Sequence, residues 1–141
     1  MKSINMEFIR YLNLFEQTTG IETKYCFFYN NQLIFVVKNK LVSKAIGQGG
    51  KNVKKMMKIL KKKVKIVPNP KNNSETEIRK FISKIIEPKQ FNDLTIDKNN
   101  KELIISADKR NKAALIGREK KRREELSNIT GNLFDMSVKI T

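Results

Sequence analysis

The sequence of 141 residues has no histidine, no tryptophan and a single cysteine, Cys26. Without histidine the chain lacks the usual general base, the commonest metal ligand and the base of a Ser-His or Cys-His nucleophile. One cysteine can form no disulfide within the chain and cannot supply a zinc knuckle or ribbon. We therefore predict a protein that is not an enzyme, with no catalytic residue, metal, cofactor or small-molecule substrate. Cys26 lies in the apolar run 25–29, where we expect a buried, inert thiol.

Long apolar stretches and nucleotide-loop motifs are also missing. No run of about eighteen apolar residues occurs, and the first residues lack the hydrophobic region of a signal peptide. These absences predict a soluble, cytoplasmic protein that makes no membrane contact. The glycine-rich segment 47–50 has neither the spacing nor the hydroxyl residue of a GxxxxGK[ST] phosphate loop.

Acidic residues are few relative to basic ones. Thirty Lys and Arg stand against fourteen Asp and Glu, which gives a net charge of +16 and a pI near 10.0. Residues 1–70 hold 14 basic and 3 acidic residues (net +11), and residues 71–141 hold 16 and 11 (net +5). Such a field attracts polyanions. The alternative is a lysine-rich proteome whose extra charge only covers solvated faces, but the concentration in the first half favours a nucleic-acid ligand.

The apolar periodicity of the first half predicts the order helix, strand, strand, helix, helix, strand. Asn30-Asn31 separates the two strands as a tight hairpin, since Asn tolerates left-handed backbone angles. Val53, Met56, Met57 and Leu60 recur on one face of the second internal helix. The predicted elements are a helix over 5–18, strands over 24–29 and 32–37, a helix over 41–46, the helix through 53–60 and a strand over 64–67.

The second half repeats this order, which indicates an internal duplication. Ser74 and Glu77 have the spacing of a capping box at the start of its first helix, and Pro88 ends that helix. The further predicted elements are strands over 91–97 and 102–106, helices over 109–116 and 121–130, the latter ending at Gly131, and a strand over 133–140. We predict an α+β protein with two domains, 1–67 and 74–141, joined by a Pro- and Asn-rich linker over 68–73.

The motif Gly47-Gln48-Gly49-Gly50 lies between two predicted helices in the most basic part of the chain. Glycines let the backbone adopt unusual dihedral angles and let a phosphate approach the main-chain N–H groups. The helix that follows presents its positive end to that phosphate. Val42 and Ile46 are candidates for an apolar floor under the bases. The predicted RNA-binding residues here are Lys44, Ile46, Gly47, Gln48, Gly49, Gly50, Lys51, Asn52, Lys54 and Lys55.

Together with the strand 35–37 before it, the segment 45–53 resembles the GxxG region of the archaeal NusA-type transcription factors. The resemblance covers nearly the whole chain. It implies two tandem type II KH domains, each with a small three-stranded sheet. It also implies binding of single-stranded RNA during transcription elongation and termination, with RNA polymerase as a further candidate partner. We expect a monomer. The alternative is a ribosome-associated KH protein in the assembly or structure of ribosomal RNA.

The second copy of the loop has lost two of its glycines. Gly117 retains the first glycine, but Glu119 and Lys120 stand where Gly49 and Gly50 stand in the first copy. A carboxylate would repel a phosphate, and lysine adopts positive φ less easily than glycine. Three interpretations remain open. The second loop binds RNA weakly, or the second domain only supports the first, or the loop holds phosphates by charge alone through Arg118, Lys120, Lys121 and Arg122. The candidate RNA-binding residues in this copy are Gly117, Arg118, Lys120 and Lys121.

Overall fold

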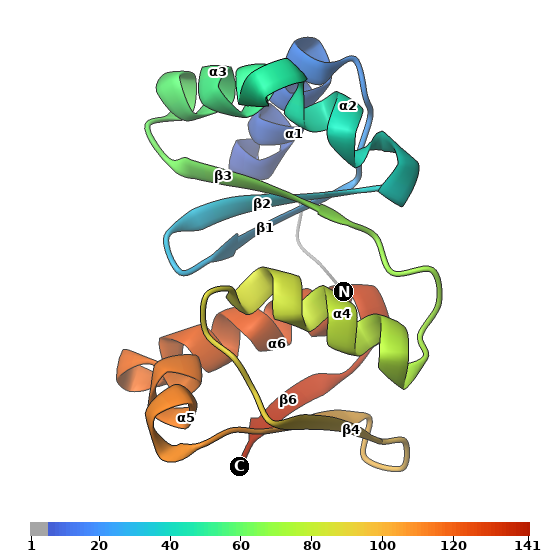
Figure 1. Ribbon diagram of the computed structural model, residues 1–141, viewed down its shortest axis with the longest axis vertical. Coiled ribbons are helices and arrows are strands. Elements are labelled where there is room, and N and C mark those ends of the chain that lie inside the picture. Colours follow the sequence, from blue (N-terminus) through green and yellow to red (C-terminus); the bar gives the residue numbers. More distant parts are fainter. Residues whose placement is uncertain (1–5) are drawn as a thin grey trace. The chain divides into compact units, whose positions relative to one another are not determined.

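Each half of the chain folds as a helix, two strands, two helices and a strand (Figure 1). The computed structural model describes residues 6–141, so the predicted helix start at residue 5 lies outside the described part. The chain divides into two compact units, with the boundary between Asn69 and Pro70. Each unit contains one three-stranded mixed sheet, which confirms the predicted α+β class.

Unit 1 carries its helices on one face of the sheet β1-β2-β3. Its elements are α1 (Met6–Thr19), β1 (Tyr25–Tyr29), β2 (Gln32–Val37), α2 (Val42–Ile46), α3 (Lys51–Leu60) and β3 (Lys63–Pro68), with 3-10 turns at Asn39–Leu41 (η1) and Gln48–Gly50 (η2). β3 therefore extends one residue beyond each end of the strand predicted over 64–67. Pro68 closes β3 opposite Val37, because the Asn69 N–H donates to the Val37 carbonyl at 2.7 Å.

The hairpin between β1 and β2 is the tight turn that the sequence predicts. Asn30 and Asn31 have φ values of 50° and 62°. Positive φ at both central residues is the type I′ geometry, which matches the twist of paired antiparallel strands. β2 then pairs in parallel with β3, from Gln32 opposite Lys63 onward. A parallel pair needs a crossover, and α2 and α3 supply it.

The core of unit 1 fixes α3 against the sheet. Met56 and Ala45 are fully buried, and the rings of Phe15 and Phe35 stack with centroids 4.5 Å apart. Cys26 is buried in the same cluster, and burial raises the pKa of its thiol. The prediction of a buried cysteine is confirmed, and a raised pKa disfavours the reactive thiolate.

Unit 2 repeats this architecture, with sheet order β4-β5-β6. Its elements are α4 (Glu75–Ile86), β4 (Asp93–Asp97), β5 (Glu102–Ser106), α5 (Lys109–Ile116), a 3-10 turn at Arg118–Lys120 (η3), α6 (Lys121–Phe134) and β6 (Ser137–Ile140). The parallel register is equivalent in the two sheets: Gln32 faces Lys63 in one, and Glu102 faces Ser137 in the other. Residues 32 and 102 differ by seventy positions, the same offset that relates the two loops.

Three predicted boundaries in unit 2 are wrong. β4 begins at Asp93 rather than 91, and β6 begins at Ser137 rather than 133. The helix predicted to end at Gly131 continues through it to Phe134. The reason is packing, because Phe134 is buried and its ring meets that of Phe81 edge to face at 5.8 Å. This burial outweighs the cost of about 1 kcal/mol for glycine inside a helix.

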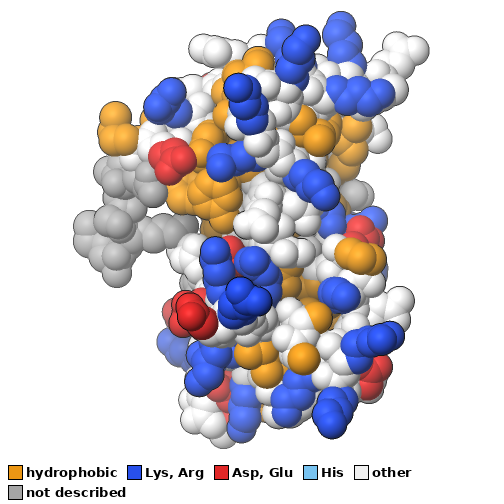
Figure 2. All heavy atoms as spheres, turned by 90° about the vertical axis from the view of Figure 1, so that its left-hand side faces the viewer, with side chains coloured by type: hydrophobic (Ala, Val, Ile, Leu, Met, Phe, Trp, Pro, Cys, Tyr) orange, Lys and Arg blue, Asp and Glu red, His pale blue; other side chains and the backbone are white. Residues whose placement is uncertain are grey.

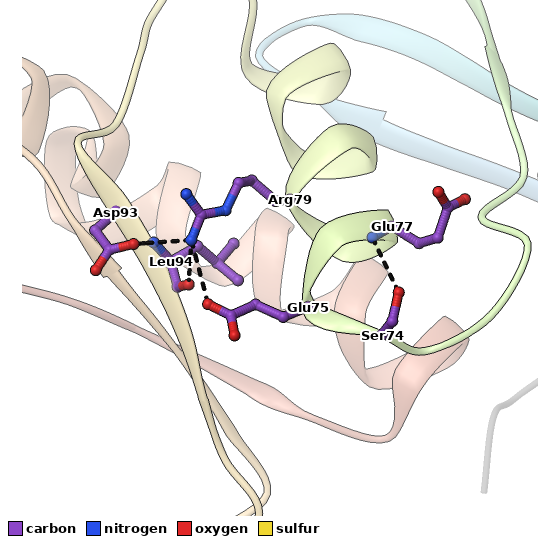
Figure 3. A network of polar contacts seen from close by, with 6 residues as sticks. All are labelled: Ser74, Glu75, Glu77, Arg79, Asp93 and Leu94. Atoms are coloured by element: carbon purple, nitrogen blue, oxygen red, sulfur yellow. Dashed lines mark hydrogen bonds and ion pairs between the residues drawn. The ribbon is translucent and has the colours of Figure 1, made fainter.

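A polar network ties α4 to the first strand of unit 2 (Figure 3). The Arg79 guanidinium contacts Glu75 at 3.2 Å and Asp93 at 2.8 Å, and it donates to the Leu94 carbonyl at 3.0 Å. At the start of the helix, Ser74 Oγ accepts from the Glu77 N–H at 3.2 Å. Half of the predicted capping box is therefore present.

In a complete capping box the Glu77 carboxylate would accept from the Ser74 N–H. Here the carboxylate makes a different contact. It accepts from the Lys71 N–H at 3.0 Å, and this hydrogen bond is the main cause of its lowered pKa.

Within residues 6–141 no helix is long and apolar enough to cross a membrane.

Phe134→Ala tests the extended helix. We expect a loss of about 3–5 kcal/mol in the free energy of unfolding, the usual cost of removing a buried ring. Leu133→Ala is the control, since Leu133 is only half-buried on the same turn. Urea unfolding followed by circular dichroism measures both. Equal, small effects would contradict the burial of Phe134.

Candidate nucleic-acid interface

The loop 47–50 in unit 1 is a short reversal between α2 and α3. Gly47 has φ 82° and ψ 162°, Gly49 has φ 64° and ψ 19°, and Gly50 has φ 76° and ψ 19°. The Gly50 N–H donates to the Gly47 carbonyl at 3.0 Å, and the Lys51 N–H donates to the Gln48 carbonyl. The turn is thus closed by its own hydrogen bonds.

Gly47 is the one position in this loop where the fold itself requires glycine. Its dihedral angles fall in a region that is essentially restricted to glycine. In addition, a Cβ at this position would lie 3.0 Å from the backbone nitrogen and from side-chain atoms of Asn52. The Asn52 amide in turn donates to the Lys44 carbonyl at 3.3 Å and links the two helices.

The other two glycines leave open space. A Cβ on Gly49 would meet nothing within 4 Å, and one on Gly50 would meet only the end of the Lys54 side chain at 3.7 Å. Within residues 6–141, the N–H groups of Gln48 and Gly49 have no backbone acceptor. Successive N–H groups in such a turn form a concave site that suits an anion.

The start of α3 adds to this site. Its N-cap is Gly50, which provides no side-chain acceptor, whereas Ser74 caps α4 and Asp108 caps α5. An uncapped helix N-terminus has free N–H groups and a partial positive charge, and both favour a phosphate.

Unpaired lysines surround the loop. Lys44, Lys51, Lys54 and Lys55 are all exposed, and in the part of the chain that the structure describes none of them forms an ion pair with a carboxylate. Figure 2 shows Lys and Arg side chains spread over one face of the molecule, with few acidic side chains among them. The positive charge near the loop is therefore available to a polyanion.

The loop in unit 2 has the same backbone conformation despite its different residues. Gly117 has φ 76° and ψ 171°, Glu119 has φ 56° and ψ 28°, and Lys120 has φ 62° and ψ 21°. The turn is closed in the same way, because the Lys120 N–H donates to the Gly117 carbonyl at 3.1 Å. Two residues with side chains thus occupy the left-handed region, at a cost of about 1–2 kcal/mol each.

The charges near the second loop are partly neutralised. Arg122 and Glu125 form an ion pair, and each side chain is only 18% exposed. Arg122 is therefore not free to hold a phosphate, contrary to the interpretation that included it. Arg123 is half-buried at the position of Val53, and it donates to the Val138 carbonyl at 3.4 Å. Arg118, Lys120 and Lys121 remain exposed.

The structure places the predicted residues of each copy on one loop and on the helix residues that flank it. In unit 1 only Asn52 has a role that the sequence did not indicate, since its amide holds the turn from within. No periodic signal could have revealed this contact, which joins residues eight positions apart across a reversal. Ile46 is half-buried and packs against the core, so part of its surface is exposed beside the loop.

The geometry defines a two-unit α+β protein with a glycine-rich loop between two helices of the first unit. Comparison shows similarity to the probable transcription termination protein NusA of Methanococcus vannielii, with 28% identity over 102 residues, 72% of this chain and 56% of that protein. The protein of the same name from Methanocaldococcus jannaschii is 30% identical over 101 residues, 72% of this chain and 52% of that protein. The chain thus spans about half the length of these relatives.

Two further comparisons concern the fold. The crystal structure of APE1850 superposes with a TM-score of 0.68 and 24% identity, covering 98% of this chain and 100% of that one. At this identity the likeness shows a shared fold. No protein-family model matches the chain.

Gly47→Ala should destabilise unit 1 more than Gly50→Ala. The first change places alanine in a glycine-only region, at about 1–3 kcal/mol, and also displaces Asn52. The second change places alanine in a left-handed conformation without a clash, which lowers the free energy of unfolding by about 1 kcal/mol. Urea unfolding compares the two variants. A larger loss for Gly50→Ala would show that the close approach of Gly47 to Asn52 is not the limiting constraint.

Proposed function

We propose that this chain is a NusA-type RNA-binding transcription factor that holds nascent single-stranded RNA at the loop 47–50. In this proposal residues 1–67 and 74–141 are two type II KH domains, and the protein binds rather than catalyses. It acts in the cytoplasm during elongation and termination, as a monomer, with RNA polymerase as its second partner. The names of the two archaeal relatives support the transcriptional role.

One observation carries the proposal: Gly49 and Gly50 are not needed to build the loop. Unit 2 forms the same backbone with Glu119 and Lys120, so the fold tolerates side chains at both positions. In unit 1 the glycines leave the space above the N–H groups open. A KH domain closes such a loop on the sugar–phosphate backbone of about four unpaired nucleotides, which requires that open space.

The surroundings supply the rest of the recognition. Lys44 and Lys51 flank the loop, and Lys54 and Lys55 lie on the first turns of α3. These lysines would neutralise phosphates on both sides of the one that the turn holds. Unit 2 has residues with side chains, Glu119 and Lys120, at the equivalent positions. We therefore assign the main RNA contact to unit 1 and a lesser contact to Gly117, Arg118, Lys120 and Lys121.

A pair of double variants tests this assignment. Gln48→Asp with Gly49→Asp places two carboxylates where the phosphate would lie, and we expect affinity for a single-stranded RNA to fall more than tenfold. Arg118→Asp with Glu119→Asp is the matched control, because it makes the same change of −2 in net charge at the equivalent positions. We expect a loss below about threefold for the control.

Fluorescence anisotropy with a labelled, unstructured RNA measures both, and circular dichroism verifies the fold. Equal losses would mean that RNA responds only to net charge. A loss confined to the second loop would place the main grip in unit 2 and contradict the proposal.

Salt provides an independent test of the phosphate contacts. Each phosphate neutralised on a single strand contributes about −0.7 to the slope of log K against log salt concentration. For the four nucleotides of a KH site we expect a slope near −3. A flat plot would show that the lysines around the loop do not contact RNA.

A further inference from the structure

A basic cleft in unit 1 has a lining that includes none of the loop residues 47–50. Its volume is about 510 Å³, and residues of the α1–β1 connection, the end of β2, η1 and α2 line it. This volume is within the range of about 300–1,000 Å³ that ligand sites occupy. Val36, Val37 and Leu41 are among its apolar lining residues, whereas Val42 and Ile46, the residues predicted as an apolar floor beside the loop, do not line it.

The segments that line the cleft are fixed by hydrogen bonds of their own. The Thr23 hydroxyl donates to the Val36 carbonyl and accepts from the Tyr25 N–H, which fixes the α1–β1 connection against β2. On the other side, the Leu41 N–H donates to the Lys38 carbonyl at 2.8 Å. Gly20 lies at the rim, and a Cβ there would meet nothing within 4 Å.

Its chemistry suits a nucleotide. Its lining residues include three lysines, Lys24, Lys38 and Lys44, but one acidic residue, Glu22. Tyr25, which is half-buried, stacks on Phe27 and presents an aromatic surface to the cleft. Single-stranded nucleic acid is bound by this combination of cations along the backbone and aromatic or apolar surfaces under the bases.

Lys44 connects the cleft to the loop. It lines the cleft, its carbonyl accepts from Asn52, and it precedes Gly47 by less than one helical turn. A strand held at Gly49 and Gly50 can therefore continue past Lys44. We propose, on the basis of the proposed RNA-binding function, that this cleft takes up a nucleotide of the same RNA strand beyond the four held at the loop.

The test compares short and long RNA. Lys24→Glu with Lys38→Glu alters the cleft and leaves the loop residues unchanged. We expect its affinity for an unstructured uridine octamer to fall about tenfold and its affinity for a uridine tetramer to change less than threefold. Lys40→Glu with Lys98→Glu is the matched control, since both lysines are exposed and neither lines the cleft. We expect the control to weaken both RNAs by less than threefold.

Each other outcome overturns the proposal in a distinguishable way. Unchanged octamer binding by the cleft variant would show that RNA does not enter the cleft, and an equal loss for the tetramer would show a general charge effect. The same selective loss in the control variant would also exclude a specific site. If the unaltered protein bound neither RNA, the proposed function itself would fail. Photo-crosslinking of an octamer containing 4-thiouridine should label the segment 20–25, and labelling only elsewhere would overturn the proposal.

Discussion

The first glycine of each loop is the constraint on which both units depend. The backbone at Gly47 lies so close to Asn52, and that at Gly117 so close to Arg122, that a Cβ at either position would be 3.0 Å or less from the neighbouring residue. This close approach allows a reversal of only a few residues. The second helix can then return over the sheet, bury Met56 or Leu126 and deliver the last strand in parallel register.

The later glycines are under a different constraint. Their left-handed conformation is strained for residues with side chains but accessible to them, as Glu119 and Lys120 show. The fold can therefore exchange these residues at a modest cost in stability. Neither Gly49 nor Gly50 lies within van der Waals distance of backbone atoms, so glycine relieves backbone strain at these positions but is not needed to avoid a clash. The difference between the copies thus separates the first glycine, which the turn requires, from the later glycines, which the turn can replace.

The sequence predicted the elements well wherever one physical signal dominated. Val53, Met56 and Leu60 defined α3, and Asn30-Asn31 defined a hairpin, because periodicity and local backbone preference act over a few residues. Prediction failed where contacts distant in the sequence decide. The buried ring of Phe134 carries α6 past Gly131, and the backbone of the second loop follows its helices rather than the preferences of Glu119 and Lys120. The ion pair of Arg122 with Glu125 is local, three residues apart on α6, but a count of charges does not reveal it.

Charge and backbone geometry are independent properties, yet they coincide at one loop. The lysines around Gly49 have no carboxylate partners among the residues described, so they repel one another and raise the free energy of the folded unit. In unit 2 the Arg122–Glu125 pair lowers this repulsion beside a loop that side chains already cover. A bound phosphate chain would relieve the repulsion in unit 1, where the N–H groups are open, and would gain less in unit 2. Electrostatics would therefore favour phosphate binding at the loop 47–50, the same loop where Gly49 and Gly50 leave the N–H groups open.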